Sequence, residues 1–156
     1  MTKARSTVFL VLLAVLLAVF FFYRTAGTSV EYPVTGEFAG VSLRLDYATT
    51  TAARELGLGG RMSVPDGYGM LFVFPKTDFY GFWMKDTLVP LDMFWLDSKG
   101  QVLYIAADVA TSTYPHVFYP SSPALYVLET AAGFARAHRV TIGTSLILKN
   151  FPIVSE

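Results

Sequence analysis

Gly69-Met70-Leu71-Phe72-Val73-Phe74 and Phe82-Trp83-Met84-Lys85-Asp86-Thr87-Leu88-Val89-Pro90-Leu91-Asp92 are two closely spaced apolar and aromatic runs near the middle of the chain. Short runs of this composition are typical of buried β-strands. The second run also carries charged side chains, among them Lys85 and Asp92. A carboxylate buried among such strands costs several kcal/mol unless a cation or backbone donors accompany it. The two runs therefore predict the centre of a sheet and a charge that needs a partner.

The rest of the chain from residue 38 onward alternates strand patterns with turns. Leu43 and Leu45 alternate with polar residues between 38 and 47, which predicts a strand with one solvated face. Asp97-Ser98-Lys99-Gly100 predicts the turn of a hairpin. The other predicted strands cover residues 70–74, 79–85, 91–96, 101–107, 125–129 and 144–149.

Two short helices and a long loop complete the pattern. Threonines that can act as N-caps precede a helix predicted at 52–56, which Gly57 can end, and a second helix at 131–139. Residues 111–123 contain three prolines and are predicted to form a loop, whose aromatic residues 114–120 either pack on the sheet or contact a partner. The fold class that follows is α+β, with a mainly antiparallel, curled and barrel-like sheet, two short helices and a preceding transmembrane helix.

The predicted strand at 91–96 is apolar on both of its faces. Leu91, Met93 and Trp95 share one face, whereas Phe94 and Leu96 share the other face with Asp92. A strand of this kind is covered on both sides, so it lies inside the sheet rather than at its edge. Asp92 is then expected to be buried.

A cation for Asp92 can be proposed from the spacing. If the predicted strands 79–86 and 91–96 form a hairpin about residues 88–89, Lys85 falls opposite Asp92 and Trp83 opposite Phe94. In one interpretation the Lys85–Asp92 pair only fixes the register of the hairpin. In the other, the two charges and Arg61 line a small pocket walled by Trp83.

Glu129 is a further candidate for the same pocket. It ends a predicted strand just before a helix, a position where site residues are often found. Interaction with the positive end of that helix explains it equally well. The candidate ligand-binding residues are thus Arg61, Trp83, Lys85, Asp92 and Glu129.

The first 24 residues are predicted to form a membrane anchor. Lys3 and Arg5 precede an uncharged apolar stretch at 7–23, whose 17 residues are just long enough to span a bilayer. Basic residues ahead of the stretch place the N-terminus in the cytoplasm and the remainder outside. The alternative is a cleaved signal peptide and a secreted domain. The predicted organisation is therefore an anchor at 1–24, a linker at 25–34 and one β-rich domain at 35–156.

Charge and cysteine content exclude several classes of function. Residues 24–156 carry 10 Lys/Arg and 12 Asp/Glu, a formal net charge of −2, so no basic excess favours nucleic-acid binding. The chain has no cysteine, which excludes disulfides, thiol catalysis and thiolate metal sites. The two histidines, His116 and His138, do not have a spacing that indicates a metal site. No catalytic or cofactor-binding motif is present, so no cofactor is predicted.

The motifs resemble a known family of bacterial and archaeal proteins, the one catalogued as domain of unknown function 192. The resemblance covers roughly residues 54–146 and rests on both central runs, the hairpin with Gly100, and Tyr126-Val127-Leu128-Glu129 followed by Gly133. It implies a compact β-rich fold and no settled activity. One departure is Asp86, where the family pattern favours Asn.

Three functions follow as hypotheses. The first is a membrane-tethered extracytoplasmic binding or accessory domain without catalysis, anchored through residues 7–23, with a small molecule, a sugar or an envelope protein as its partner. The second is a small cell-surface hydrolase that uses Asp92 or Glu129 as acid or base, possible for a wall-facing enzyme. The third is a structural module of an envelope complex that makes contact through residues 111–123.

Overall fold

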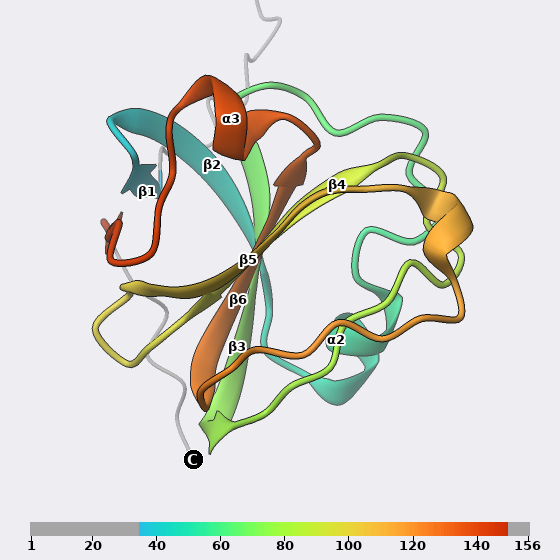
Figure 1. Cartoon of the computed structure of the whole chain (residues 1–156), viewed down its shortest axis with the longest axis horizontal. Helices are drawn as coiled ribbons and strands as arrows, with labels where there is room; N and C mark the ends of the chain where they lie inside the picture. The colour runs from blue at the N-terminus through green and yellow to red at the C-terminus, as the bar shows by residue number, and fades with distance from the viewer. Residues whose placement is uncertain (1–34, 150–156) are drawn as a thin grey trace, which may run out of the picture. The chain divides into compact units, whose positions relative to one another are not determined.

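The computed structural model describes residues 35–149, in which a mixed sheet of seven strands curls into a half-barrel with two short α-helices (Figure 1). The strand order is β5-β4-β6-β3-β2-β1-β7. The elements are β1 Gly36–Phe38, β2 Val41–Ala48, α2 Thr51–Leu56, β3 Tyr68–Asp78, β4 Leu91–Leu96, β5 Val102–Val109, the 3₁₀ turn η1 Thr111–Thr113, β6 Ala124–Ala131, α3 Phe134–Ala137 and β7 Leu146–Leu148.

The sheet is mixed because one neighbouring pair of strands is parallel. β2 and β3 run in the same direction, and the chain between them passes through α2. Every other neighbouring pair within residues 35–149 is antiparallel. The two edge strands approach each other at one end, where Gln101 and Ser145 form a β-bridge and Val102 N donates to Thr144 O at 2.9 Å. The predicted curled sheet is therefore confirmed, with the parallel pair as a correction.

Both faces of the sheet are covered, as the pattern of β4 predicts. Leu91, Met93 and Trp95 belong to an apolar cluster on the face toward α2, while Phe94 and Leu96 belong to a second cluster with Phe134 of α3. All six residues of β4 are buried. β4 lies inside the sheet, between β5 and β6.

The predicted strand at 79–85 is wrong. Only Phe82 makes a β-bridge in this segment, through two backbone hydrogen bonds with Phe118. β3 instead continues to Asp78, where it pairs with Ala124 of β6. The chain then turns back over the face of the sheet, where Tyr80 and Phe82 pack against the apolar cluster of that face.

The predicted helices differ in how well local signals place them. The helix at 52–56 is confirmed as α2, with Thr50 Oγ1 accepting from Ala53 N at 3.2 Å as its N-cap. The helix at 131–139 begins later than expected, because Ala131 still pairs with Leu91 of β4. Gly133, at φ 88°, makes the turn into α3.

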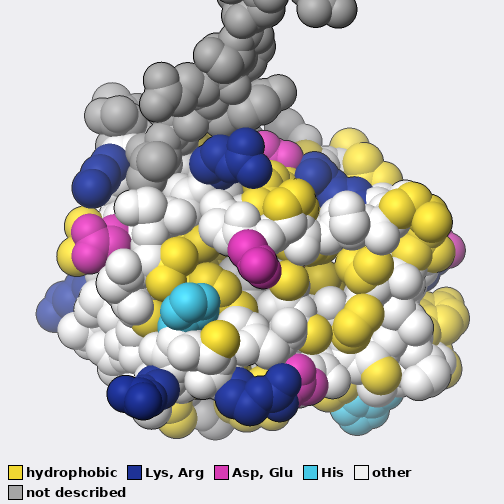
Figure 2. All heavy atoms as spheres, turned by 90° about the horizontal axis from the view of Figure 1, so that it is seen from above, with side chains coloured by type: hydrophobic (Ala, Val, Ile, Leu, Met, Phe, Trp, Pro, Cys, Tyr) yellow, Lys and Arg dark blue, Asp and Glu magenta, His cyan; other side chains and the backbone are white. Residues whose placement is uncertain are grey.

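The predicted anchor at 1–24 and linker at 25–34 lie outside the described residues. Between residues 35 and 149 no helix has both the length and the apolar character needed to cross a bilayer. On the face shown in Figure 2, cationic and anionic side chains are dispersed among apolar and neutral ones and form no large patch of one sign.

Candidate functional site

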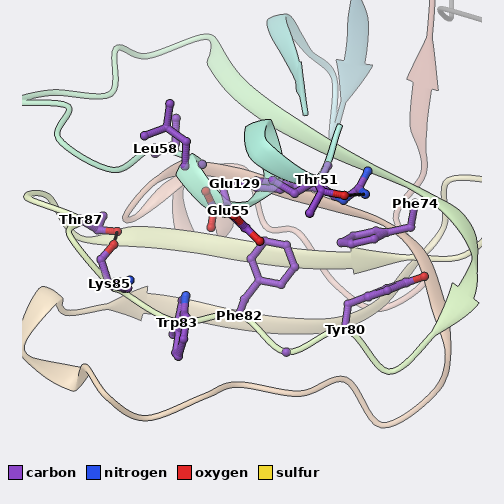
Figure 3. A pocket seen from close by; sticks show the side chains of 15 residues that line it. Thr51, Glu55, Leu58, Phe74, Tyr80, Phe82, Trp83, Lys85, Thr87 and Glu129 are labelled. Atoms are coloured by element: carbon purple, nitrogen blue, oxygen red, sulfur yellow. Dashed lines mark hydrogen bonds between the residues drawn. The ribbon is translucent and has the colours of Figure 1, made fainter. Parts of the chain in front are cut away.

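A pocket of about 490 Å³ opens between α2 and the segment 79–88, on the sheet face opposite α3 (Figure 3). Volumes of a few hundred Å³ are typical of small-molecule sites. Its walls come from α2 and the turn after it, from Phe72 and Phe74 in the middle of β3, and from residues 80–87. β6 contributes a single side chain, that of Glu129.

Arg54 fixes the wall formed by α2. Its Nη1 donates to Thr49 O at 2.6 Å and to Val73 O at 3.0 Å, and its guanidinium lies 5.2 Å from the centroid of the Phe74 ring. α2 has no buried residue, so the contacts of Arg54 and the packing of the partly buried Ala53 on the apolar cluster hold it against the sheet. Arg54 was not among the predicted site residues, although its place in a capped helix just before the glycine turn was visible in the sequence.

The opposite wall, formed by residues 80–87, is held in place by aromatic packing, by a hydrogen bond from a side chain to the backbone, and by backbone–backbone hydrogen bonds. The Tyr80 ring stacks on that of Phe74 at 3.5 Å between centroids, and Phe82 packs edge-on against Phe72 at 4.8 Å. Trp95 Nε1 donates to Tyr80 O at 2.8 Å, and Phe82 exchanges backbone hydrogen bonds with Phe118. The segment is therefore pinned to β4 and to the loop at 111–123, whose aromatic residues serve in part as packing.

Glu129 is the unusual residue of this pocket. It lies in β6 between Met70 of β3 and Met93 of β4, and it is 4% exposed. No donor in the described part of the chain forms a hydrogen bond or ion pair with its carboxyl group. Burial alone raises the pKa of Glu129 to about 8. The group is therefore mostly protonated at neutral pH.

Trp83 and Lys85 lie at the mouth of the pocket, as Figure 3 shows. The Trp83 side chain is 48% exposed and meets the Tyr114 ring edge-on at 5.9 Å. Lys85 Nζ lies 6.0 Å from the centroid of the Trp83 ring, within the range of a weak cation–π contact. Lys85 makes no ion pair within residues 35–149.

The predicted Lys85–Asp92 pair is wrong. Asp92 is fully buried on the face that α3 covers, whereas Lys85 is exposed at the pocket on the other face. Backbone donors satisfy the carboxylate instead: Asp108 N donates to Oδ1 at 2.6 Å and Ala135 N to Oδ2 at 2.7 Å. The pairing failed because residues 79–86 do not form a strand. Phe94 likewise faces Ile105 and Leu128, not Trp83.

The interaction with a helix N-terminus that was considered for Glu129 is made by Asp92, since Ala135 belongs to the first turn of α3. Adjacent strands thus carry two buried carboxyl groups on opposite faces of the sheet. Asp92, under α3, has two backbone donors, and Glu129, under the pocket, has none among residues 35–149.

Arg61 does not line the pocket. Its Nη2 donates to Asp46 Oδ2 at 2.9 Å, and its guanidinium lies 5.1 Å from the centroid of the Tyr68 ring. Tyr68 Oη donates to the same carboxylate at 2.6 Å. Burial opposes ionisation of Asp46, but the hydrogen bonds from Tyr68 and Arg61 lower its pKa overall. The structure therefore brings Trp83, Lys85 and Glu129 together and leaves Arg61 and Asp92 elsewhere.

Comparison with known proteins places this fold in a group without a settled function. A protein from Sinorhizobium meliloti 1021, described as a proposed transcription regulator, is 32% identical, with a TM-score of 0.66, and the match covers 68% of this chain and 81% of that one. A protein of unknown function from Novosphingobium aromaticivorans DSM 12444 is 29% identical, with a TM-score of 0.65, and the match covers 72% and 81%. No curated protein matches the chain. A family model described as "Uncharacterized ACR" matches residues 34–148, and the chain therefore belongs to the family catalogued as domain of unknown function 192.

Proposed function

We propose that the protein is a membrane-tethered extracytoplasmic domain that binds a small molecule in the pocket above Glu129. One observation carries this proposal: Glu129, a residue 4% exposed, presents to a pocket of about 490 Å³ a carboxyl group that has no hydrogen-bond partner among residues 35–149. A buried polar group without a hydrogen bond destabilises a fold by about 1–3 kcal/mol. Such a cost is commonly retained where a ligand supplies the missing bond.

The proposed tether is residues 7–23, with Lys3 and Arg5 on the cytoplasmic side. The described domain would then face the outside, where it meets envelope components and imported solutes. Reporter fusions at the C-terminus test this orientation. A reporter active only in the cytoplasm should be silent there, and activity of that reporter would contradict the proposal.

A screen of chemically diverse small molecules by thermal shift tests the binding function, with the full-length protein in detergent. A ligand that binds only the native state raises the melting temperature, and the rise grows with the logarithm of its concentration relative to its Kd. Glu129→Leu should abolish the shift for any ligand that hydrogen-bonds the carboxyl, while Glu129→Gln should largely keep it, because an amide also donates and accepts. Glu37→Leu, on β1 and outside the pocket, is the matched control. Equal shifts in Glu129→Leu and in the unsubstituted protein would contradict the proposal.

A cell-surface hydrolase remains the second candidate because the pKa of Glu129 is raised into the range suited to a general acid. Glu55 is the other carboxyl group that lines the pocket. Asp92 is unsuited to this role, since both its oxygens accept backbone hydrogen bonds in the interior. Glu129→Gln separates the two functions. A general acid is lost in this variant and turnover stops, whereas simple binding persists.

A further inference from the structure

The chemistry of the pocket can be taken further, on the basis of the proposed function. We infer that the ligand is a sugar-like ring compound that carries an acidic group. Its ring would lie against the aromatic wall, a hydroxyl would meet Glu129, and its acid would meet Lys85. Three features of the pocket support this class of ligand.

The first feature is the shape and composition of the walls. Phe72, Phe74, Tyr80, Phe82 and Trp83 all line the pocket, so its apolar surface is largely aromatic. The Trp83 ring also extends to the solvent beside Tyr114, which widens the aromatic surface at the mouth. Flat apolar surfaces with polar groups at their edges suit a ring that has apolar faces and polar substituents.

The second feature is the protonation of Glu129. A protonated carboxyl group has one O–H donor and one free acceptor oxygen. It therefore satisfies a hydroxyl group, which also donates and accepts, without the need for a countercharge. No side chain among the described residues forms a hydrogen bond with this carboxyl group, so a hydroxyl group of the ligand would supply the missing partner.

The third feature is the balance of charge around the pocket. Arg54 and Lys85 are cationic, Glu55 is anionic, and Glu129 is mostly neutral, which leaves a formal excess of one positive charge. Arg54 is already engaged by two backbone carbonyls, whereas the Lys85 ammonium has no anionic partner within residues 35–149. Lys85 can therefore pair with an acidic substituent, and an amino group in the same place would be repelled.

Three forms of one ring test this inference: glucose, glucuronate and 6-amino-6-deoxyglucose, which carry a hydroxyl, an acid and an amino group on the same carbon, with the galactose series alongside. Saturation-transfer NMR with the full-length protein in detergent measures their relative affinities. We expect glucuronate or galacturonate to bind at least tenfold more tightly than the neutral and amino forms. Lys85→Gln should remove that preference and leave the neutral sugar within about twofold. Lys99→Gln, an exposed lysine in the β4–β5 turn, is the matched control.

The outcomes separate this inference from the proposed function. Tighter binding of the amino sugar, an acid preference that survives Lys85→Gln, or no binding in either sugar series would overturn the ligand class. If another compound binds and Glu129→Leu abolishes its binding, the pocket still functions and only the ligand class is wrong. If Glu129→Leu affects no ligand at all, the proposed function itself fails.

Discussion

Among single residues, Glu129 is expected to make stability depend on pH. Its pKa is about 8 in the folded protein and near 4.5 in the unfolded chain. Between these values the folded state holds a proton that the unfolded state has lost, so stability falls as pH rises. The slope for one group is at most about 1.4 kcal/mol per pH unit. Urea unfolding at pH 5, 6, 7 and 8 measures it.

Glu129→Gln is the control for this pH dependence, because an amide does not titrate. The difference in unfolding free energy between this variant and the unsubstituted protein should grow in favour of the variant from pH 5 to pH 8. If the difference stays constant over this range, Glu129 titrates normally. Water then reaches its carboxyl group more freely than the 4% exposure of Glu129 indicates.

Asp92 and Lys85 are expected to differ sharply when they are substituted. Asp92→Asn places an NH₂ group against a backbone N–H and weakens a charge-assisted hydrogen bond, at a cost of about 2–4 kcal/mol. Lys85→Gln should change stability by less than about 0.5 kcal/mol, since exposed residues without an ion pair contribute little. Chemical denaturation compares the two. A loss in Lys85→Gln as large as the loss in Asp92→Asn would contradict this expectation.

The elements that local signals specify are the ones that the sequence predicted correctly. α2 follows from the Thr50 cap and Gly57, and the β4–β5 hairpin from its Asp97–Gly100 turn. The strand at 79–85 was predicted wrongly because an apolar run without clear alternation indicates burial, not pairing. Within this segment, Phe82 pairs with Phe118, which lies in a loop far away in the sequence, and no local pattern identifies that pairing.

Local sequence patterns also failed to show the tertiary contacts of the candidate site. The burial of Asp92 followed from β4 being apolar on both faces, but its donors come from β5 and from α3, which only the tertiary structure brings to it. Trp83, Lys85 and Glu129 were singled out as unusual residues, and they do meet in one pocket. Arg54 and Glu55 were missed, because a capped surface helix gives no sign of what it faces.

Closure of the half-barrel depends on Gly100 at the β4–β5 turn. Gly100 has φ 78°, and an added Cβ would lie 2.6 Å from Leu146 O in β7. Gly40 has the same φ of 78°, but an added Cβ there would meet nothing within 4 Å. A substitution at Gly40 therefore measures the cost of the backbone conformation without a steric clash. Gly40→Ala should cost about 1 kcal/mol and Gly100→Ala clearly more, measured by urea unfolding. Equal costs would mean that β7 can move away without loss.

At the scale of the whole molecule, local stability should be lowest in α2. The helix buries no residue and makes few contacts, whereas β6 lies between β3 and β4 and is buried along most of its length. Segments with little burial open locally at low free-energy cost, while central strands exchange only when the fold opens widely. Hydrogen exchange should therefore be fastest in α2 and slowest in β6 and β4, with the edge strands β5 and β7 between them.

A bound ligand should change that order in one place. Because α2 forms one wall of the pocket and β1 does not line it, a ligand should slow exchange in α2 and leave β1 unchanged. Exchange measured with and without saturating ligand, followed by mass spectrometry of peptides from each element, checks this. A uniform slowing across all strands would instead mean that the ligand stabilises the fold globally, and slowing confined to β1 and β7 would place its site away from Glu129.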